Sequence, residues 1–491
     1  MERFFDNNAL QIVKNLERCG YKAYLVGGCV RDAMLHRIPN DHDICTNARP
    51  EDIIRIFGEN NTIPTGLKHG TITVKFNEGL YEVTTFRQES DYKDGRHPDS
   101  VEFVQDVVFD LCRRDFTINA MAYNPQTGLM DLFGGKKDLE DGIVRCVGAP
   151  AMRFAEDALR ILRMVRFAAR YNFDIAPDTQ EAANKYASEL RKVSKERITD
   201  ELVKILVAPQ PAKYIKNNKE IFFAILPELR AMDGCEQNTP YHEYDVFDHT
   251  LTSLTNIEFD LFEDEFSTSH VFSDDEKLVI LLSVLFHDVA KPHCKTTDEN
   301  GVDHFYTHAV KSSQLASDIM RKRLRLPNKI TETVELLIKY HDLKYYAHDY
   351  DELETRQLLS KFGLENLRLL IAVRLADLVG HGSGAKNYTE TLSAYYKTKY
   401  FIRVIAKVAE EKPALTVKDL KVNGNDIIAL GEAPGPQVGF YLSELLDLVI
   451  ENPELNEREF LLGKVKDWRK TFEHIAQKGS ELFDKTKENA E

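Results

Sequence analysis

The sequence predicts an α+β protein in which a small mixed α/β head precedes three regions built from helices. Apolar and polar residues alternate with period two in "HGTITVKF" and again in "LYEVTTFR", and the "NEG" between them supplies a turn, so we expect a sheet hairpin. From about residue 149 the apolar positions recur at three-and-four spacing, which is typical of amphipathic helices. We place the regions at 1–148, 149–230, 231–395 and 396–491.

The individual elements follow the same two periods along the chain. Leu10, Val13 and Leu16 share one face of a helix that we expect to end near Gly20. "AYLVGG" is a short apolar strand that runs into a glycine turn. The stretch "RFAEDALRILRMVRFAARYNF", residues 153–173, predicts one long amphipathic helix. The C-terminal region is expected to be a helical body with a frayed tail.

The composition is that of an ordinary globular protein, with 43% apolar and 29% charged residues. The N-terminus lacks the apolar core of a signal peptide, and the longest apolar run, residues 278–286, is too short to span a bilayer. Seven cysteines without a CxxC pair favour reduced thiols. We therefore expect a cytoplasmic protein with no membrane partner.

The net charge of −15 does not exclude a nucleic-acid partner, because the acidic residues are concentrated in one segment. Between Arg230 and Lys277 there are thirteen Asp and Glu residues and no Lys or Arg. Residues 153–204 instead carry eleven Lys and Arg against nine Asp and Glu. The local field steers a polyanion, so this second stretch is a candidate RNA surface, although a solvated helix face is the alternative.

The stretch "YLVGGCVRDAMLHRIPNDHDI", residues 24–44, combines a glycine turn with paired carboxylates. A glycine such as Gly28 lets backbone amides approach phosphate, and Arg31 is placed to pair with one. Asp41 and Asp43 are two residues apart on an extended segment, so they face the same side and repel each other unless a cation lies between them. Magnesium suits such a pair and aligns triphosphates. The alternative is a structural turn and a helix cap.

A second motif, "DLCRRDFTINAMAYN" at 110–124, places two arginines beside hydrogen-bonding side chains. Arg113 and Arg114 offer planar donor pairs that match phosphate, while Asp115 and Asn119 can bond to ribose hydroxyls. The alternative is a helix N-terminus with Asp115 near its cap.

The predicted helix 153–173 carries Asp157, Arg160 and Arg163 at intervals of three, within an arc of about 120°. A carboxylate accepts from an exocyclic amino group, and a guanidinium donates to the adjacent ring nitrogen. Cytosine and adenine share that edge, whereas uracil and guanine present the reverse and leave buried groups unpaired, at about 1–3 kcal/mol each. The pattern predicts a site that accepts C and A. Arg166 lies half a turn away and suits phosphate binding or packing, and the alternative for the whole set is a salt-bridged surface.

These motifs, "GGCVRD…DHD", "RRDFTINA" and "EDALRILRMVRF" in this order, resemble the class II nucleotidyltransferases of the DNA polymerase beta superfamily, and among them the bacterial CCA-adding enzymes. The resemblance covers residues 21–205 and includes "DLFGGKKDLEDGIVRCVG" as a head-to-neck connector and "KERITDELVKIL" as a neck motif. It implies a catalytic head at 1–148, a neck at 149–230 that binds base and RNA, and template-independent addition of CCA to tRNA 3′ ends from CTP and ATP.

The resemblance also implies roles for individual residues. Asp41 and Asp43 hold Mg²⁺ and are the catalytic residues, and Arg113 or Arg114 contacts the triphosphate. Asp115 contacts the ribose. Asp157, Arg160 and Arg163 select the base. The implied nucleotide-binding residues are Gly28, Arg31, Arg113, Arg114, Asp115, Asn119, Asp157, Arg160, Arg163 and Arg166.

Two relatives of this family share the same head. Poly(A) polymerases are generally basic, and no strongly basic tail occurs in this sequence. CC-adding enzymes lack a flexible loop between the carboxylate and arginine motifs, and we identify "SDYKDGRHPD" at 90–99 as that loop. The loop favours addition of the final A, with a poly(A) polymerase or A-adding enzyme as the alternative.

The histidine-rich region 231–395 resembles the HD metal-dependent phosphohydrolases through "VFDHTL", "LFHDVAKP", "THAV", "KYHDL" and "RLADLVGH". Such sites use neutral imidazoles and carboxylates around a metal that activates water. The implied activity is a phosphatase or cyclic phosphodiesterase, and a fold retained for packing is the alternative. For the protein as a whole, two other classes of function are a phosphohydrolase with an RNA-binding head and a non-catalytic RNA-binding scaffold. The implied ligands are His249, His287, Asp288 and Asp377, with His308 and His341 for a second divalent metal.

Overall fold

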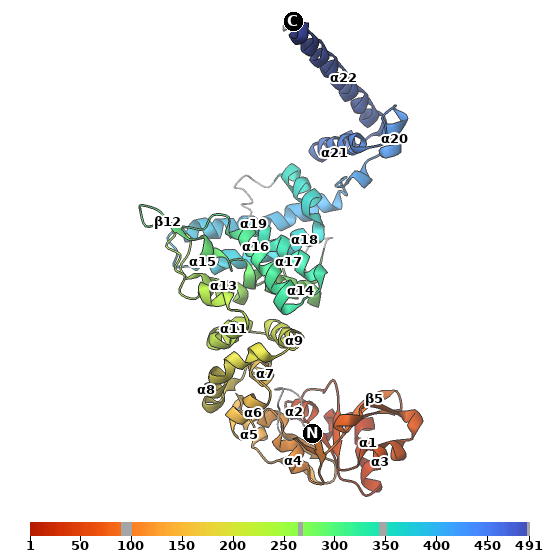
Figure 1. Ribbon diagram of the computed structural model, residues 1–491, viewed down its shortest axis with the longest axis vertical. Helices are drawn as coiled ribbons and strands as arrows, with labels where there is room; N and C mark the ends of the chain where they lie inside the picture. Colours follow the sequence, from red (N-terminus) through yellow and green to blue (C-terminus); the bar gives the residue numbers. More distant parts are fainter. Residues whose placement is uncertain (90–100, 264–268, 343–350, 489–491) are drawn as a thin grey trace.

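The computed structural model describes residues 1–89, 101–263, 269–342 and 351–488. The molecule is elongated, and its parts follow one another in sequence order from the head at one end to the C-terminal helix at the other (Figure 1). The predicted α+β class is confirmed, with the large sheet confined to the head. The loop predicted at 90–99 lies outside the described residues.

The head is built on a seven-stranded mixed sheet in the order β3-β4-β5-β2-β1-β8-β9. The neighbouring strands are antiparallel except for β2 and β5, which are parallel. The predicted hairpin is confirmed as β4 and β5, which turn at Asn77, a residue in the left-handed region. The strands are β1 (Ala23–Val26), β2 (Asp43–Thr46), β3 (Thr62–Gly66), β4 (Thr71–Phe76), β5 (Gly79–Thr85), β8 (Met121–Asn124) and β9 (Gly128–Asp131).

Short helices cover the sheet. The predicted first helix is confirmed: the Asp6 side chain caps it by accepting from the Asn8 amide, and Leu10, Val13 and Leu16 are buried. A further strand pair joins β6 (Arg87–Glu89) to β7 (Val101–Phe103). The head helices are α1 (Asn7–Arg18), α2 (Gly28–Met34), α3 (Pro50–Phe57), α4 (Val107–Cys112) and α5 (Gly135–Asp141).

The prediction of one helix over 153–173 is wrong, because the chain breaks at Asp157. Asp157 has φ −149° and ψ 105°, and its carboxylate accepts from the Leu159 amide at 3.0 Å. An aspartate that bonds to a nearby backbone amide offers an alternative to the helical bond, so the first helix ends and a second begins. The neck helices are α6 (Pro150–Glu156), α7 (Leu159–Tyr171), α8 (Pro177–Tyr186), α9 (Lys195–Leu206), α10 (Pro211–Asn217), α11 (Lys219–Ile225) and α12 (Glu228–Met232).

The histidine-rich region is a helical layer packed around α14, whose residues from Leu278 to Phe286 are all buried. The hydrophobic core is continuous from the head through the neck into this region. α18 contains a kink at Gly363, where φ is 72°. The helices are α13 (Val246–Thr255), α14 (Asp274–Phe286), α15 (Lys291–Cys294), α16 (His308–Asp318), α17 (Asn328–Tyr340), α18 (Glu352–Gly380) and α19 (Tyr388–Glu410).

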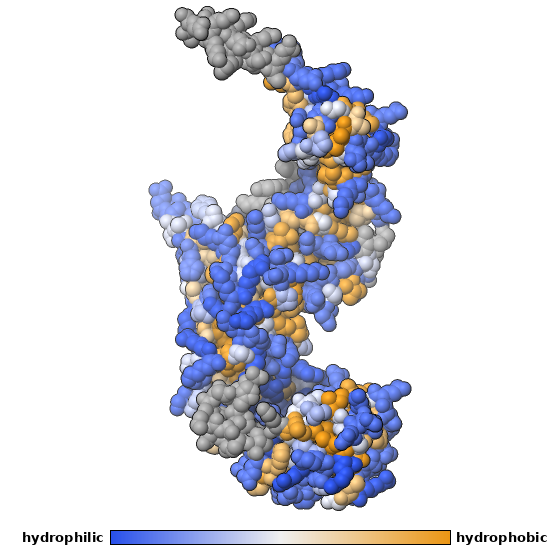
Figure 2. All heavy atoms as spheres, turned by 45° about the vertical axis from the view of Figure 1, so that its right-hand side comes forward, coloured by the Kyte–Doolittle hydropathy of each residue, from blue (hydrophilic) through white to orange (hydrophobic). Residues whose placement is uncertain are grey.

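The C-terminal part has a small core of its own, formed by α20 (Gly424–Ala429), α21 (Pro436–Glu451) and α22 (Arg458–Glu488). The buried Arg356 of α18 joins it to the rest by donating to the carbonyls of Ile450 and Glu451. Apolar side chains reach the surface of this part (Figure 2). Phe440 and Phe472 are both exposed. Within the described ranges no helix combines the length and the apolar character that crossing a membrane requires.

Candidate active site and a candidate metal centre

A cavity of about 790 Å³ lies between the head and the neck helices α7 and α9. Its wall comes from the β1–α2 turn, the start of β2, the end of α4 and the facing sides of α7 and α9. The structure brings every head and neck residue singled out above to this one cavity. These are Gly28, Arg31, Asp41, Asp43, Arg113, Arg114, Asp115, Asn119, Asp157, Arg160, Arg163 and Arg166.

Asp41 and Asp43 present two carboxylates to the cavity. Asp43 is the first residue of β2, and Asp41 lies two residues before it. Although Asp43 keeps an exposed edge, its pKa is raised to about 6, because burial of the carboxylate and the charge of Asp41 outweigh the opposing effect of Arg114. A divalent cation between the two removes this repulsion, and carboxylate oxygens are the ligands of a hard cation. The residues present therefore fit a divalent metal.

Arg31 is expected to pair with a phosphate, but it is buried, with only 5% of its surface exposed. Its guanidinium donates to the Asn119 side-chain oxygen at 2.5 Å and to the neighbouring Asp32. The guanidinium carbon also lies 5.2 and 5.0 Å from the ring centres of Phe167 and Tyr171 on α7. Arg31 thus links the head to the neck at the edge of the cavity.

Asp115 joins the two parts from the other side. Its carboxylate accepts from the side-chain Nδ2 of Asn119 at 3.0 Å and from the Nε and Nη2 of Arg163 at 2.8 and 2.6 Å. Burial alone would raise the pKa of Asp115, but Arg163 and the hydrogen bonds hold it well below the usual range. Asp115 therefore stays ionised and fixes an arginine of α7 against the head.

The three residues expected on one helix face do not share a helix, and each has a different partner. Asp157 precedes α7 and accepts from Arg197 Nη2 at 2.6 Å. Arg160 donates to Glu156 at 2.5 Å, and Arg163 is bound to the head. The predicted i, i+3 arrangement of Asp157 is thus wrong, yet all three side chains still line the same cavity.

The sequence reasoning missed one wall of the cavity, which helix α9 supplies. Arg197, Asp200, Glu201 and Lys204 recur at three-and-four spacing and so share one helix face. Glu201, which is buried, accepts from Arg166 of α7 at 3.0 Å. The spacing was visible in "KERITDELVKIL", but only the packing of α9 against α7 shows where that face points.

The cavity is positive although the chain is acidic. Nine Arg and Lys side chains and seven Asp and Glu side chains line it. A concave wall with this balance attracts polyanions, since local charge and not net charge sets the field that a ligand meets.

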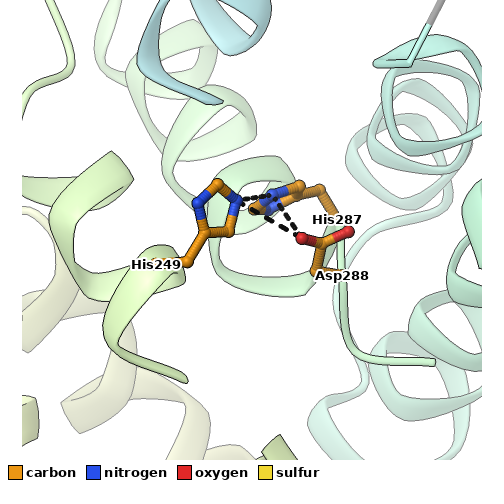
Figure 3. Close-up of side chains that lie close together, drawn as sticks. All are labelled: His249, His287 and Asp288. Atoms are coloured by element: carbon orange, nitrogen blue, oxygen red, sulfur yellow. Dashed lines mark hydrogen bonds and ion pairs between the residues drawn. The ribbon is translucent and has the colours of Figure 1, made fainter. Parts of the chain in front are cut away.

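A second cluster lies in the histidine-rich region (Figure 3). His249 of α13 and His287, which ends α14, approach each other with Nε2 atoms 3.0 Å apart. One oxygen of Asp288 lies 3.3 and 3.2 Å from these two nitrogens. Asp377 of α18 adds an oxygen 3.2 Å from His249 Nε2. Four residues spread over 129 positions of the chain therefore meet at one buried point.

The other oxygen of Asp288 faces two more imidazoles. His308 Nε2 lies 3.4 Å from it and His341 Nε2 lies 3.8 Å from it. Two groups among the described residues can hold a metal ion, and they share Asp288. The six ligands implied above are all in this cluster.

Asp288 is fully buried, and its two oxygens are surrounded by imidazoles at ion-pair distance. Such a carboxylate requires positive charge nearby. Lys291, a residue that the sequence reasoning did not single out, places its Nζ 2.7 Å away. Although burial acts to lower the pKa of His287, Asp288 raises it to about 10, whereas burial lowers the pKa of His341 to about 3. The donor set of imidazoles and carboxylates fits one or two divalent metal ions.

The cavity and the cluster occur in a chain with several known relatives. The family model described as "Poly A polymerase head domain" matches residues 23–145, and that described as "Probable RNA and SrmB- binding site of polymerase A" matches residues 172–232. The CCA-adding enzyme of Lactobacillus johnsonii is 48% identical over 461 residues, which cover 92% of this chain and 96% of the relative.

Two solved structures are similar over nearly the whole chain. The Bacillus stearothermophilus CCA-adding enzyme in complex with CTP has a TM-score of 0.64 at 28% identity and covers 95% of this chain and 98% of its own. The Thermotoga maritima CCA-adding enzyme complexed with tRNA shares the fold, with a TM-score of 0.57 at 21% identity and 94% of each chain covered.

Proposed function

Because the chain belongs to the family of CCA-adding enzymes, we propose that it adds C, C and A to the 3′ ends of tRNA from CTP and ATP in the cavity between head and neck. It is a nucleotidyltransferase that works without a nucleic-acid template, with residues 1–148 as the head and 149–230 as the neck. One observation carries the proposal: a single cavity contains paired carboxylates, phosphate-binding arginines and the side chains expected to select the base.

The reaction is an attack of the terminal ribose hydroxyl on the α-phosphate, with pyrophosphate as leaving group. Asp41 and Asp43 would hold Mg²⁺, which when bound would supply charge stabilisation and lower the pKa of the attacking hydroxyl. Arg113 and Arg114, at the end of α4, neutralise the triphosphate. Asp115, ionised and held by Arg163, orients the ribose from the head side.

Residues at and just after the break between α6 and α7 select the base. Asp157 accepts from the exocyclic amino group of cytosine or adenine, and Arg160 donates to the adjacent ring nitrogen. Both side chains are held by ion pairs, to Arg197 and to Glu156, so they meet the base in a fixed arrangement. Uracil and guanine leave buried groups unpaired there, which costs about 1–3 kcal/mol for each group.

The test is incubation with a tRNA that ends at its discriminator base, with labelled CTP, ATP and magnesium. We expect incorporation of two C and one A. Long A tails would instead identify a poly(A) polymerase, and absence of incorporation would contradict the proposal.

We also propose a metal-dependent phosphohydrolase at the second cluster, since the buried Asp288 lies between two groups of histidines, each able to hold a metal ion. Residues 231–395 form this domain, and 396–491 form the C-terminal body. The residues of the cluster would hold a divalent metal, which would supply an activated water for attack on a phosphate ester. Asp288 holds both ligand groups together, and Lys291 balances its charge. A phosphomonoester or cyclic phosphate at an RNA 3′ end is the proposed substrate class.

The experiment measures metal content and phosphate release from RNAs with 3′-phosphate or 2′,3′-cyclic phosphate ends, with and without added divalent metal. His287→Ala should lose the hydrolysis and the metal bound at this cluster, while an Asp41→Ala variant keeps both. Hydrolysis that survives in His287→Ala would contradict the assignment.

A further inference from the structure

Asp110 is a buried carboxylate that none of the roles above uses. It lies on α4, is 0% exposed and does not line the cavity. Around it are the apolar residues of a small second core beneath the sheet, including Val107 and Leu111 of the same helix. A charge in such a place is costly unless it is paired, so its partners indicate what it does.

The partners of Asp110 are the two arginines at the end of α4. One oxygen accepts from Arg113 Nε at 3.1 Å and from its Nη2 at 2.7 Å. The other oxygen accepts from Arg114 Nη2 at 3.3 Å. Burial acts to raise the pKa of Asp110, but the two guanidinium groups outweigh it and lower the pKa. One ionised carboxylate outside the cavity wall thus binds both arginines.

The side chains of both arginines are also exposed to the cavity. Their side chains are 21% and 19% exposed, against 1% for that of Asp110, and both line the cavity. Arg114 is held further by a bond from Nη1 to the Asn119 carbonyl. A Cβ added to Gly27 would lie 2.7 Å from Arg114 Nη1, so the glycine turn leaves the space that this guanidinium occupies.

The end of α4 is fixed from the neck as well. Arg153 donates to the Cys112 carbonyl at 2.9 Å, and Arg160 donates to the Arg113 carbonyl at 3.1 Å. These bonds satisfy carbonyls that a helix C-terminus leaves open. The backbone that carries Arg113 and Arg114 is therefore held, and what remains to be set is the direction of their side chains.

We propose that Asp110 is a positioning residue for nucleotidyl transfer, which holds the guanidinium groups of Arg113 and Arg114 in the direction in which they meet the triphosphate. The inference rests on the proposed role of these arginines in binding the nucleotide. An unrestrained arginine loses rotamer freedom when it binds phosphate, whereas a guanidinium already held by a carboxylate has lost it on folding. The single charge of Asp110 still leaves the arginine pair with a net positive charge.

The first test is Asp110→Asn, which keeps the shape but replaces one acceptor by an amide donor that faces a guanidinium. We expect the KM for CTP and for ATP to rise about tenfold each, while the KM for tRNA stays within about twofold. Asp110→Glu, which keeps the charge, should recover part of the nucleotide affinity. A purely structural role would change all KM values and the melting temperature together.

The matched control is Asp106→Ala at the N-terminus of the same helix. Asp106 is exposed and caps α4 by accepting from the Val108 amide at 3.1 Å, so its removal weakens the helix without contact to the arginines. We expect unchanged KM values for CTP and ATP. If Asp106→Ala raises the nucleotide KM as much as Asp110→Asn does, the positioning role is wrong.

A second measurement covers the case in which Asp110→Asn folds poorly because two guanidinium groups lose their partner. In an Arg113→Met/Arg114→Met background, the Kd for CTP measured by titration calorimetry should not change on adding Asp110→Asn, since nothing remains to be positioned. A further loss of affinity would overturn the proposal. Failure of the proposed function is a separate result, because then the parent protein itself adds no nucleotide.

Discussion

At the scale of single residues, the cavity shows how pairing decides which groups keep a charge. Asp115 is buried but stays ionised, because Arg163 and Asn119 bind it. Asp43 lacks such a direct partner and lies near Asp41, so its pKa rises to about 6. A divalent cation between Asp41 and Asp43 would relieve this repulsion and lower the pKa of Asp43.

Removal of the paired carboxylates should abolish nucleotide addition. In Asp41→Ala and Asp43→Ala variants we expect the rate of CTP incorporation into tRNA to fall by about 10²-fold or more, because the metal can no longer be held. Glu51→Gln, an exposed substitution on α3 of the same head, is the matched control and should leave the rate unchanged. Incorporation at the parental rate in either aspartate variant would contradict the site.

The raised pKa of Asp43 predicts a pH dependence of its own. Its pKa is higher in the folded chain than in the unfolded one, so between about pH 4 and 6 the folded state binds more protons, and stability falls as the pH rises through this window. Asp43→Asn should therefore raise the melting temperature of the metal-free protein at pH 7.5 and have little effect at pH 4. A lower melting temperature at pH 7.5 would show that burial and the charge of Asp41 do not destabilise the ionised carboxylate of Asp43.

At the scale of elements, the break between α6 and α7 is the feature that local periodicity does not show. Asp157 ends α6, accepts from the first backbone amide of α7 and binds Arg197 of α9, so three helices meet at one carboxylate. A continuous helix would have placed Asp157 one turn before Arg160. The break instead leaves its carboxylate at the wall of the cavity and in contact with α9.

Asp157→Ala should blur nucleotide choice more than it weakens RNA binding. We expect the preference for CTP over UTP, as a ratio of kcat/KM values, to fall by about tenfold or more, because the acceptor for the exocyclic amino group is gone. The Kd for tRNA should change little. Glu181→Ala, an exposed substitution on α8 in the same neck, is the control. Unchanged selectivity would contradict the role of this carboxylate.

At the scale of the whole molecule, two polar centres occur at different levels of an elongated chain (Figure 1). The cavity lies between head and neck, and the histidine cluster lies among α13, α14, α16, α17 and α18. They are joined through α9, whose Thr199 hydroxyl donates to the Leu324 carbonyl at 2.7 Å just beyond the end of α16. The two centres share no residue, so their chemistry should be separable.

Metal bound at the histidine cluster should stabilise the protein without being needed for CCA addition. We expect a higher melting temperature on adding Mn²⁺ or Ni²⁺ to the chelator-treated parent, through preferential binding to the folded state, and a smaller shift in His287→Ala, in which only the Asp41 and Asp43 pair can still bind the ion. The rate of CTP incorporation in His287→Ala should stay within about twofold of the parent, since distant sites behave additively. Loss of incorporation in that variant would show that the centres are coupled.

What the sequence determined by itself was local. The period of two in β4 and β5, the capped amphipathic helix α1 and the residue types in the motifs all follow from neighbours a few positions apart, so they can be recognised without the fold. The motifs also carried the family resemblance, and with it the expected roles of Asp41, Asp43 and the arginines. The six residues implied for the histidine cluster were likewise named from their order along the chain.

What only the tertiary structure decided was which distant groups meet. The stacking of Arg31 on Phe167 and Tyr171, the hold of Asp110 on two arginines and the wall supplied by α9 depend on packing between elements that periodicity does not place. The helix break at Asp157 belongs here too, because the local carboxylate–amide bond is supported by the contact with Arg197. Burial and ion pairing are set by these long-range contacts, and they determine which side chains stay charged and where each one points.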